Sequence, residues 1–326
     1  MNAMPPEIHP GTLSVEALAA LVPHGASVTV HKGDEADVPM ALAFALVKRG
    51  VRGLRVVTLP TCAYPASGMM IDLLIGAGCV AAVETSGISL HELGAAPRFA
   101  QAVKAGTLKV LDSTCPAVYA ALQAGAKGQP FAPLRGLIGT DLLRHRGDWR
   151  VIDNPFAEAA GAPPLAGAAC DPVVLLPALN ADVAMFHAPK ADAEGNVWVG
   201  RDRDRVLAAH AAGTVLVTVE EVVPGSFFDD EAMSAGVIPA VCVSAIAVVP
   251  GGCWPMDVRG GIDLEAVRAY QQAARSDEGF ASWVQAHVMR PGQGVGVRFG
   301  AAAAADAGAA VGAAGAAVGA VAGAAV

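Results

Sequence analysis

Residues 187–200 read HAPKADAEGNVWVG, and they decide how the second half of the chain is interpreted. The almost wholly apolar run PVVLLPALNADVAMF (172–186) precedes them, and the charged run RDRDRVLAAH (201–210) follows. Gly195 and Asn196 are residue types that a tight turn tolerates, and Val-Trp-Val is typical of a strand returning to the core. The stretch therefore predicts a hairpin at the end of a buried strand.

Short apolar runs alternate with helical patterns on both sides of this hairpin. The strand patterns lie at residues 27–30, 54–59, 79–84, 108–112, 173–176, 182–186, 196–199, 214–219 and 241–249. The helical patterns lie at residues 15–22, 39–50, 69–76, 97–106, 116–125, 204–213, 264–275 and 280–289. Strand runs that are apolar throughout are typical of strands buried on both faces. The sequence thus predicts an α/β protein with a mostly parallel open sheet flanked by helices.

Composition excludes several classes of partner and environment. The chain has 326 residues, 54% of them hydrophobic, and a net charge of −8 without a basic stripe, so we expect no binding to nucleic acid. The six cysteines form no C-x-x-C pair and no export signal precedes the first helix, which favours a reduced, cytoplasmic protein. The eight histidines form no H-x-H, H-x-x-H or H-x-x-x-H pair, so we expect no metal site.

The end of the chain differs from the rest in composition. Residues 301–326 are almost entirely alanine, glycine and valine, and residues 307–326 carry no charge. Leu, Ile and Phe, which drive membrane insertion, are absent from this stretch. We therefore predict one domain over residues 1–292 and a low-complexity tail over residues 293–326. We expect no membrane association, with a membrane or partner-helix role for the tail as the alternative.

Polar residues follow several predicted strands at their carboxyl ends, where parallel α/β sheets bind ligands. Gly33 follows strand 27–30, but Asp34 and Asp37 beside it repel an anion, which favours a turn glycine over a phosphate contact. Glu84 ends strand 79–84, and it is either a nucleophile or base, or a solvated or capping carboxylate. Thr85 and Ser86 follow it directly.

Three more polar residues stand between strand 108–112 and the next helix. Ser113 and Thr114 are expected to cap that helix, and Cys115 is either activated by the helix N-terminus or simply packed. Gly139 lies in PFAPLRGLIGTDLL (130–143), whose glycines indicate an ordered loop. His187, at the end of an apolar strand, is either a ligand or a structural histidine.

Four stretches together resemble the α-type subunit of the family I CoA-transferases, such as the glutaconate and 3-oxoacid CoA-transferases. They are the run from PRFAQ to GTDLL (97–143), LLPALNADVAMFHAPKADAEGNVWVG (175–200), VEEVVP (219–224) and IPAVCVSAIAVVPGGCWP (238–255). The most specific elements are Asp192-x-x-Gly195-Asn196 and Pro250-Gly251-Gly252 in this order. The resemblance covers roughly residues 12–290.

The resemblance implies the fold shared by CoA-transferases and sugar-phosphate isomerases, a CoA thioester as substrate, and no permanently bound cofactor. In this family a Glu attacks the thioester, an acyl–glutamyl anhydride forms, CoA adds to give a glutamyl thioester, and a second acid takes the CoA. That Glu lies in a Ser-Glu-Asn-Gly sequence on a β-type chain, and this chain has no such tetrapeptide. The resemblance therefore implies a β-type partner subunit that carries the nucleophile. The CoA pocket is expected to involve Gly33, Thr85, Ser86, Ser113, Thr114, Cys115 and Gly139.

The chain departs from the family pattern at two places. Lys32-Gly33-Asp34 stands where α-type subunits have Gly-Gly-Phe. Related ring-opening hydrolases of steroid-derived acyl-CoA carry a Glu near the position of Thr114 or Cys115, where this chain has no carboxylate, the nearest being Asp112. Such a hydrolase is therefore not expected. Two alternatives remain open, namely self-contained hydrolysis or transfer by Glu84 and a non-catalytic paralogue that binds acyl-CoA or acts as a scaffold.

Overall fold

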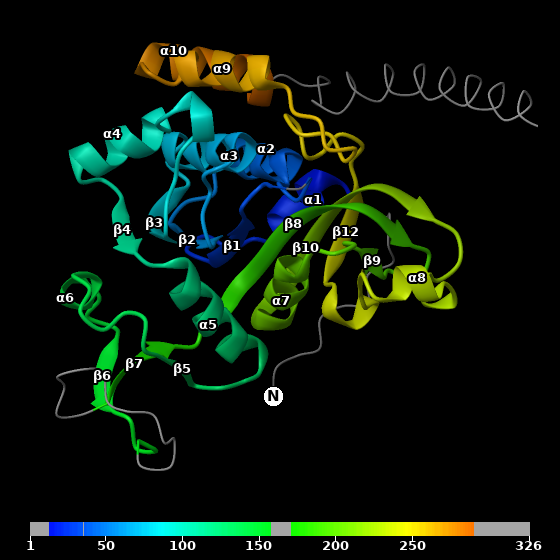
Figure 1. Cartoon of the computed structure of the whole chain (residues 1–326). Helices are drawn as coiled ribbons and strands as arrows, with labels where there is room; N and C mark the ends of the chain where they lie inside the picture. Colours follow the sequence, from blue (N-terminus) through cyan, green and yellow to red (C-terminus); the bar gives the residue numbers. More distant parts are fainter. Residues whose placement is uncertain (1–12, 35, 158–170, 290–326) are drawn as a thin grey trace, which may run out of the picture.

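Parallel strands form the centre of the structure, a computed structural model that describes residues 13–34, 36–157 and 171–289 (Figure 1). Their order across the sheet is β4-β3-β2-β1-β8-β10-β12, and each neighbouring pair is parallel. The predicted mostly parallel α/β sheet is therefore confirmed. The strand bounds are Ser27–His31 (β1), Leu54–Leu59 (β2), Val80–Thr85 (β3), Lys109–Asp112 (β4), Ala181–Asp192 (β8), Ala212–Val223 (β10) and Ala245–Val248 (β12).

The predicted hairpin at residues 187–200 is confirmed. Strand β9 (Val197–Trp198) runs antiparallel to the end of β8, and β11 (Val237–Ile238) pairs with β9. The buried Asp192 carboxylate accepts hydrogen bonds from the backbone N–H and side-chain amide of Asn196 at 2.9 and 2.8 Å, and from the Phe227 N–H at 2.9 Å. The Asp-x-x-Gly-Asn element thus fixes the shape of the turn.

Helices cover both faces of the sheet (Figure 1). One apolar core packs α1, α2, α3, α9 and α10 against one face, and a second packs α5 and α7 against the other. The bounds are Val15–Ala20 (α1), Met40–Arg49 (α2), Pro65–Gly76 (α3), Pro97–Ala105 (α4), Cys115–Ala126 (α5), Arg203–Ala211 (α7), Leu264–Ala273 (α9) and Asp277–Val284 (α10). The expected caps are present, since Ser14 accepts from the Ala17 N–H and Gly50 ends α2 with a φ of 70°.

A small antiparallel sheet lies apart from the main sheet and was not predicted. It has the order β5-β7-β6, with bounds Phe131–Leu134 (β5), Arg150–Asp153 (β6) and Pro172–Pro177 (β7). The run 173–176 is a strand as expected, but it belongs to this sheet. One face of the small sheet packs on α5 through Leu137, Trp149, Val174 and Leu176. The other face of the small sheet carries Phe131, Val173 and Leu175. Residues 173–176 are therefore apolar on both faces, which is the sequence pattern of a strand in a parallel sheet.

Short helical turns complete the described chain. They are His91–Leu93 (η1), Leu142–His145 (α6), Phe227–Asp229 (η2), Glu231–Ser234 (α8), Ala240–Cys242 (η3) and Gln285–Met289 (η4). The turn η3 shortens the strand expected at 241–249 to β12. Among the described residues, no helix has the length and apolar character that a membrane span requires. The predicted tail and its boundary at residue 292 lie outside the described residues.

Gly68 sets how closely α3 approaches the loop that follows β3. A Cβ at this position would lie 1.9 Å from the Ser89 carbonyl oxygen, which is backbone and cannot move aside cheaply. Alanine normally stabilises a helix by about 1 kcal/mol relative to glycine. We predict the opposite sign here, with Gly68→Ala lowering the free energy of unfolding by about 2 kcal/mol or more because of overpacking.

Urea denaturation of the whole chain measures this difference. Gly136→Ala is the matched control, because a Cβ there meets nothing within 4 Å, and it should change stability by less than about 0.5 kcal/mol. Equal or higher stability of the Gly68→Ala protein would contradict the close approach.

Candidate active site at the carboxyl edge of the sheet

The polar residues after β3 and β4 lie together, as the parallel topology led us to expect. The Ser113 N–H donates to the Thr85 carbonyl at 3.0 Å, and Ser86 Oγ lies 3.4 Å from Cys115 Sγ. Thr114 caps α5 by accepting from the Ala117 N–H at 3.3 Å. Ser113 is buried, whereas Cys115 is exposed at the first turn of a twelve-residue helix. This edge therefore offers hydroxyl, thiol and helix N–H groups side by side.

The loop after β2 supports these residues from behind. Thr85 Oγ1 lies 2.8 Å from Thr58 Oγ1, and both hydroxyls are buried. Ser86 Oγ donates to the Pro60 carbonyl at 2.8 Å, and the Ser86 N–H donates to the same oxygen at 3.1 Å. The Ser86 side chain is consequently fixed in orientation.

Gly33 lies in the loop after β1 and has the left-handed conformation of a turn glycine, with a φ of +78°. A Cβ there would approach Ser67 Cβ to 2.8 Å, and the Ser67 hydroxyl donates to the Lys32 carbonyl. The Lys32 ammonium pairs with Asp34 at 3.0 Å and with Asp204 of α7 at 3.4 Å. Charged side chains therefore hold this loop to the helix that follows the hairpin.

Gly139 is separate from this cluster. It lies in the exposed turn between β5 and α6, with a φ of +84°, and a Cβ there would meet nothing within 4 Å. The structure thus places it with the small sheet, and its part in a pocket stays a prediction.

Glu84 faces α5 near the end of β3, where Arg146 binds it. Arg146 Nη1 donates to Glu84 Oε1 at 2.8 Å and to the Asp112 carbonyl at 3.1 Å. The buried Arg146 guanidinium also pairs with Asp148 at 2.8 Å and stacks over the Trp149 ring at 4.2 Å. Burial raises the pKa of Glu84 above its usual range, and the Arg146 charge opposes that rise. Glu84 therefore attaches the small sheet to the main one, which favours a structural role.

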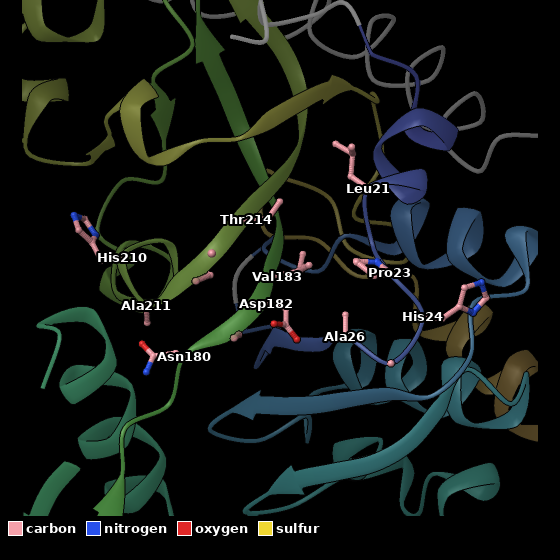
Figure 2. Close-up of a pocket in the computed structure, with 14 residues that line it drawn as sticks. Leu21, Pro23, His24, Ala26, Asn180, Asp182, Val183, His210, Ala211 and Thr214 are labelled. Carbon is pink, nitrogen blue, oxygen red and sulfur yellow. The ribbon is translucent and has the colours of Figure 1, made fainter. Parts of the chain in front are cut away.

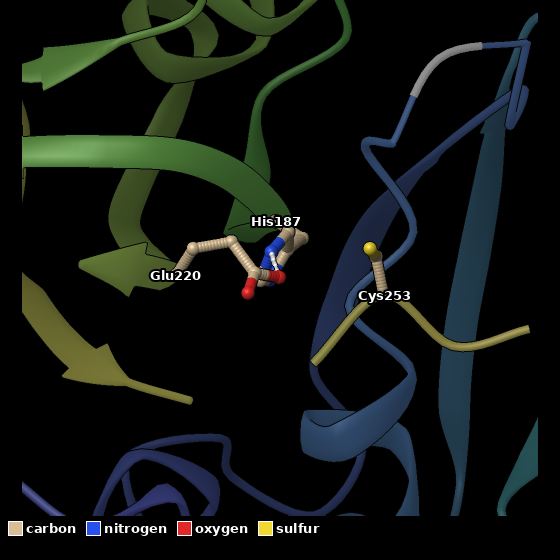
Figure 3. A group of neighbouring side chains, drawn as sticks. All are labelled: His187, Glu220 and Cys253. Carbon is tan, nitrogen blue, oxygen red and sulfur yellow. Dashed lines mark hydrogen bonds and ion pairs between the residues drawn. The ribbon is translucent and has the colours of Figure 1, made fainter. Parts of the chain in front are cut away.

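His187 lies on β8, and its ring faces the Glu220 carboxylate of β10 (Figure 3). Nε2 lies 2.9 Å from Glu220 Oε1, and Nδ1 lies 2.9 Å from Thr218 Oγ1. Burial lowers the pKa of His187, although Glu220 acts in the opposite direction. An ionised carboxylate only accepts, so Nε2 carries the ring proton and the Thr218 hydroxyl donates to Nδ1. This assigns one tautomer to the buried ring.

The Pro-Gly-Gly element closes over His187. Gly251 has a φ of +69°, and its N–H donates to Glu220 Oε2 at 2.8 Å. A Cβ on Gly252 would lie 3.1 Å from His187 Nδ1 and 2.8 Å from the Val249 carbonyl, so only glycine allows this approach. Cys253 Sγ lies nearby and contacts the Met256 carbonyl at 3.3 Å. Every donor and acceptor of the His187–Glu220 pair therefore has a partner.

Two cavities accompany the sheet. One of about 720 Å³ lies at the amino ends of β1, β8 and β10, between Ala26, Asp182 and Thr214 (Figure 2). Ligands of parallel sheets bind at the carboxyl ends, so this cavity lies at the edge opposite to the candidate site. The other, of about 300 Å³, is lined by Glu84, Arg146 and Trp149 beneath α5.

The sequence placed the residues after β3 and β4 correctly beside each other but missed the side chains that bind Glu84 and His187. Arg146 is 62 residues from Glu84, and Glu220 is 33 residues from His187. For Glu220 a signal existed, since VEEVVP and the histidine both belong to the stretches that carry the family resemblance. For Arg146, an isolated charge in a loop, there was none.

The fold and this site define an α/β protein with a parallel sheet, whose candidate active site lies at the carboxyl edge. The chain belongs to the coenzyme A transferase family, whose profile matches residues 12–248. The predicted family is thereby confirmed.

Relatives with different reactions resemble the chain. It is 29% identical to the A-type subunit of 3-oxoadipate CoA-transferase from Pseudomonas knackmussii, over 84% of this chain and 91% of the relative. It is 34% identical to the IpdA subunit of a cholesterol ring-cleaving hydrolase from Rhodococcus jostii, over 57% of this chain and 59% of the relative. Crystalline glutaconate coenzyme A-transferase from Acidaminococcus fermentans has the same fold, with a TM-score of 0.72 and 24% identity over 87% of this chain and 89% of that one.

Cys115 is the exposed thiol among the five described cysteines, since Cys62, Cys79 and Cys253 are buried and Cys242 is half-buried. We predict that iodoacetamide labels Cys115 at least about tenfold faster than the three buried cysteines, because access limits the reaction. Peptide mass spectrometry of the native protein measures the rates. Cys115→Ser is the control and should leave the slow rates unchanged; fast labelling of Cys62 or Cys253 would contradict the packing of this edge.

Proposed function

We propose that this chain is the A-type subunit of a heteromeric enzyme that transfers CoA between an acyl-CoA and a carboxylic acid, and that a β-type partner carries the nucleophilic Glu. One observation carries the proposal. Two glutamates of the main sheet, Glu84 of β3 and Glu220 of β10, are already bound, to Arg146 and to His187 with Gly251. A carboxylate held in this way orients its neighbours and is a poor nucleophile.

The chain's own residues supply a polar wall for the thioester. Attack on a thioester carbonyl develops negative charge on oxygen, which hydrogen-bond donors and a helix N-terminus stabilise. Ser113 and Cys115 stand at the start of α5, and Ser86 lies against Cys115 at 3.4 Å. We propose that Thr85, Ser86, Ser113, Thr114 and Cys115 line the part of the CoA thioester site that this chain contributes, with Gly33 at its margin.

Transfer is favoured over ring-opening hydrolysis by the residues at the start of α5. Thr114 is committed to capping, and neither it nor Cys115 is a carboxylate that activates water. Asp112 is exposed at the end of β4.

The partner is the first point to test. The chain is co-expressed, untagged, with a β-type CoA-transferase chain, and CoA exchange between an acyl-CoA and a panel of free carboxylic acids is measured. We expect a stable complex and exchange by the complex, with no exchange by either chain alone. Full activity of this chain alone would contradict the two-subunit proposal. Tight binding of acyl-CoA without turnover, even in the complex, would indicate a non-catalytic paralogue.

The position of the nucleophile is tested with Glu84→Gln. The complex is incubated with acyl-CoA and reduced with borohydride, and the modified peptide is identified by mass spectrometry. We predict that the adduct forms on the partner chain and persists in the Glu84→Gln complex, whose kcat stays within about tenfold of the unchanged complex. Loss of a covalent nucleophile lowers kcat by about 10⁴ or more.

Arg146→Gln is the matched control, because it breaks the same ion pair from the other side. Similar small losses in the two variants would show that Glu84 acts through the ion pair. An adduct on the peptide containing Glu84 would establish self-contained catalysis instead.

A further inference from the structure

Two groups of side chains at the carboxyl edge combine histidine with other metal-ligand types. One is His187, Glu220 and Cys253, and the other is His31, Asp37 and Asp202. In each group the ligand atoms lie within 4.8 Å of one another. The first group is closed, because both His187 nitrogens and both Glu220 oxygens are hydrogen-bonded. It needs no ion to satisfy it.

The second group is open. His31 is the last residue of β1 and is 1% exposed, yet neither Nδ1 nor Nε2 has a hydrogen-bond partner among the described residues. Asp37 is also 1% exposed, and its Oδ1 likewise has no partner there. Buried polar groups are nearly always satisfied, and leaving an imidazole and a carboxylate unpaired is unfavourable. These atoms therefore point to something that binds between them.

The surrounding contacts hold the group in place. The His31 ring packs edge-on against Phe186, with 5.6 Å between ring centroids. Asp202 caps α7, where its Oδ1 accepts from the Asp204 N–H at 2.8 Å and its Oδ2 accepts from Arg205 Nε at 2.7 Å. Oδ1 also accepts from the Arg205 N–H at 3.3 Å, so Oδ2, which has a second acceptor site, is the oxygen through which Asp202 can coordinate.

Charge favours a cation at this place. Four carboxylates gather here, those of Asp37 and Asp202 in the group and those of Asp34 and Asp204 beside it, whereas the neighbouring cations are Lys32 and Arg205. Lys32 already pairs with Asp34 and Asp204. Arg205 donates to Asp202 and to the His187 carbonyl, at 2.9 Å, as outer-shell groups do when they orient a metal ligand.

We propose that His31, Asp37 and Asp202 form a divalent-cation site that joins the end of β1 to the loop after it and to α7. One imidazole nitrogen with two carboxylates is a donor set for Zn²⁺ or Mn²⁺, because imidazole suits zinc and carboxylate suits manganese. The ion would hold the Lys32–Gly33–Asp34 loop at the candidate active site. The proposal does not depend on the reaction that the enzyme catalyses.

Metal content tests the site directly. The untagged full chain is stripped with EDTA, incubated with excess ZnCl₂ or MnCl₂, passed through a desalting column and analysed by plasma mass spectrometry. We expect about one ion retained per chain, and a rise in melting temperature on loading. Asp37→Asn, which keeps size and most hydrogen bonds, should lower retention at least fivefold and abolish the rise. His145→Ala, which removes an exposed histidine, is the matched control and should retain the ion.

Cobalt distinguishes the two groups of side chains. Co²⁺ bound by His31, Asp37 and Asp202 gives d–d bands without a sulfur charge-transfer band, and Cys253→Ser should leave the spectrum unchanged. A sulfur-to-cobalt band lost in Cys253→Ser would assign the ion to the His187 group and overturn the proposal. Equal retention by the wild type and a folded Asp37→Asn protein, or no retention by the wild type, would overturn it as well. If Asp37→Asn does not fold, the cobalt spectrum of the wild type decides.

Discussion

His187 is the residue on which the carboxyl edge of the sheet depends. Its N–H donates to the Asp37 carbonyl, its own carbonyl accepts from Arg205, and its ring binds Thr218 and Glu220. A fully buried imidazole with both nitrogens engaged has one tautomer and one position. Because β8 lies between β1 and β10, His187 contacts the loop after β1 and helix α7 through its backbone and strand β10 through its ring.

Two carboxylates at this edge are also held by neighbouring groups. Arg146 binds Glu84 and thereby attaches the small sheet, while His187 and Gly251 bind Glu220 and thereby fix β10. Both carboxylates complete the fold. The Cys115 thiol at the start of α5 stays exposed, and the Ser86 hydroxyl lies 3.4 Å from it. This arrangement supports the proposal that the attacking carboxylate comes from a partner chain.

Sequence reasoning succeeded where the information was local. Apolar runs bounded by helix caps predicted the order of strands and helices, and Gly195-Asn196 predicted the hairpin. The small sheet was not predicted, because residues 173–176 are apolar on both faces although only one face packs on α5. The residues after β3 and β4 could be placed together because parallel strands end at one edge. The contacts of His187 with Glu220 and of Arg146 with Glu84 could not be predicted. The first depends on the register of β8 against β10, and the second depends on the path of a loop.

Residue types alone do not distinguish the two histidine groups. They differ in their hydrogen bonds, because both ring nitrogens of His187 have partners and those of His31 have none among the described residues. Both lie on neighbouring strands, combine imidazole with carboxylate and are buried. Burial raises the pKa of Asp37 to about 8 and lowers that of His31 to about 4, so neither readily carries its charge alone. Asp37 connects the two groups, since its carbonyl accepts from the His187 N–H and its carboxylate lies in the group of His31. A ligand bound in the open group, as we propose, would therefore also affect the position of the closed group.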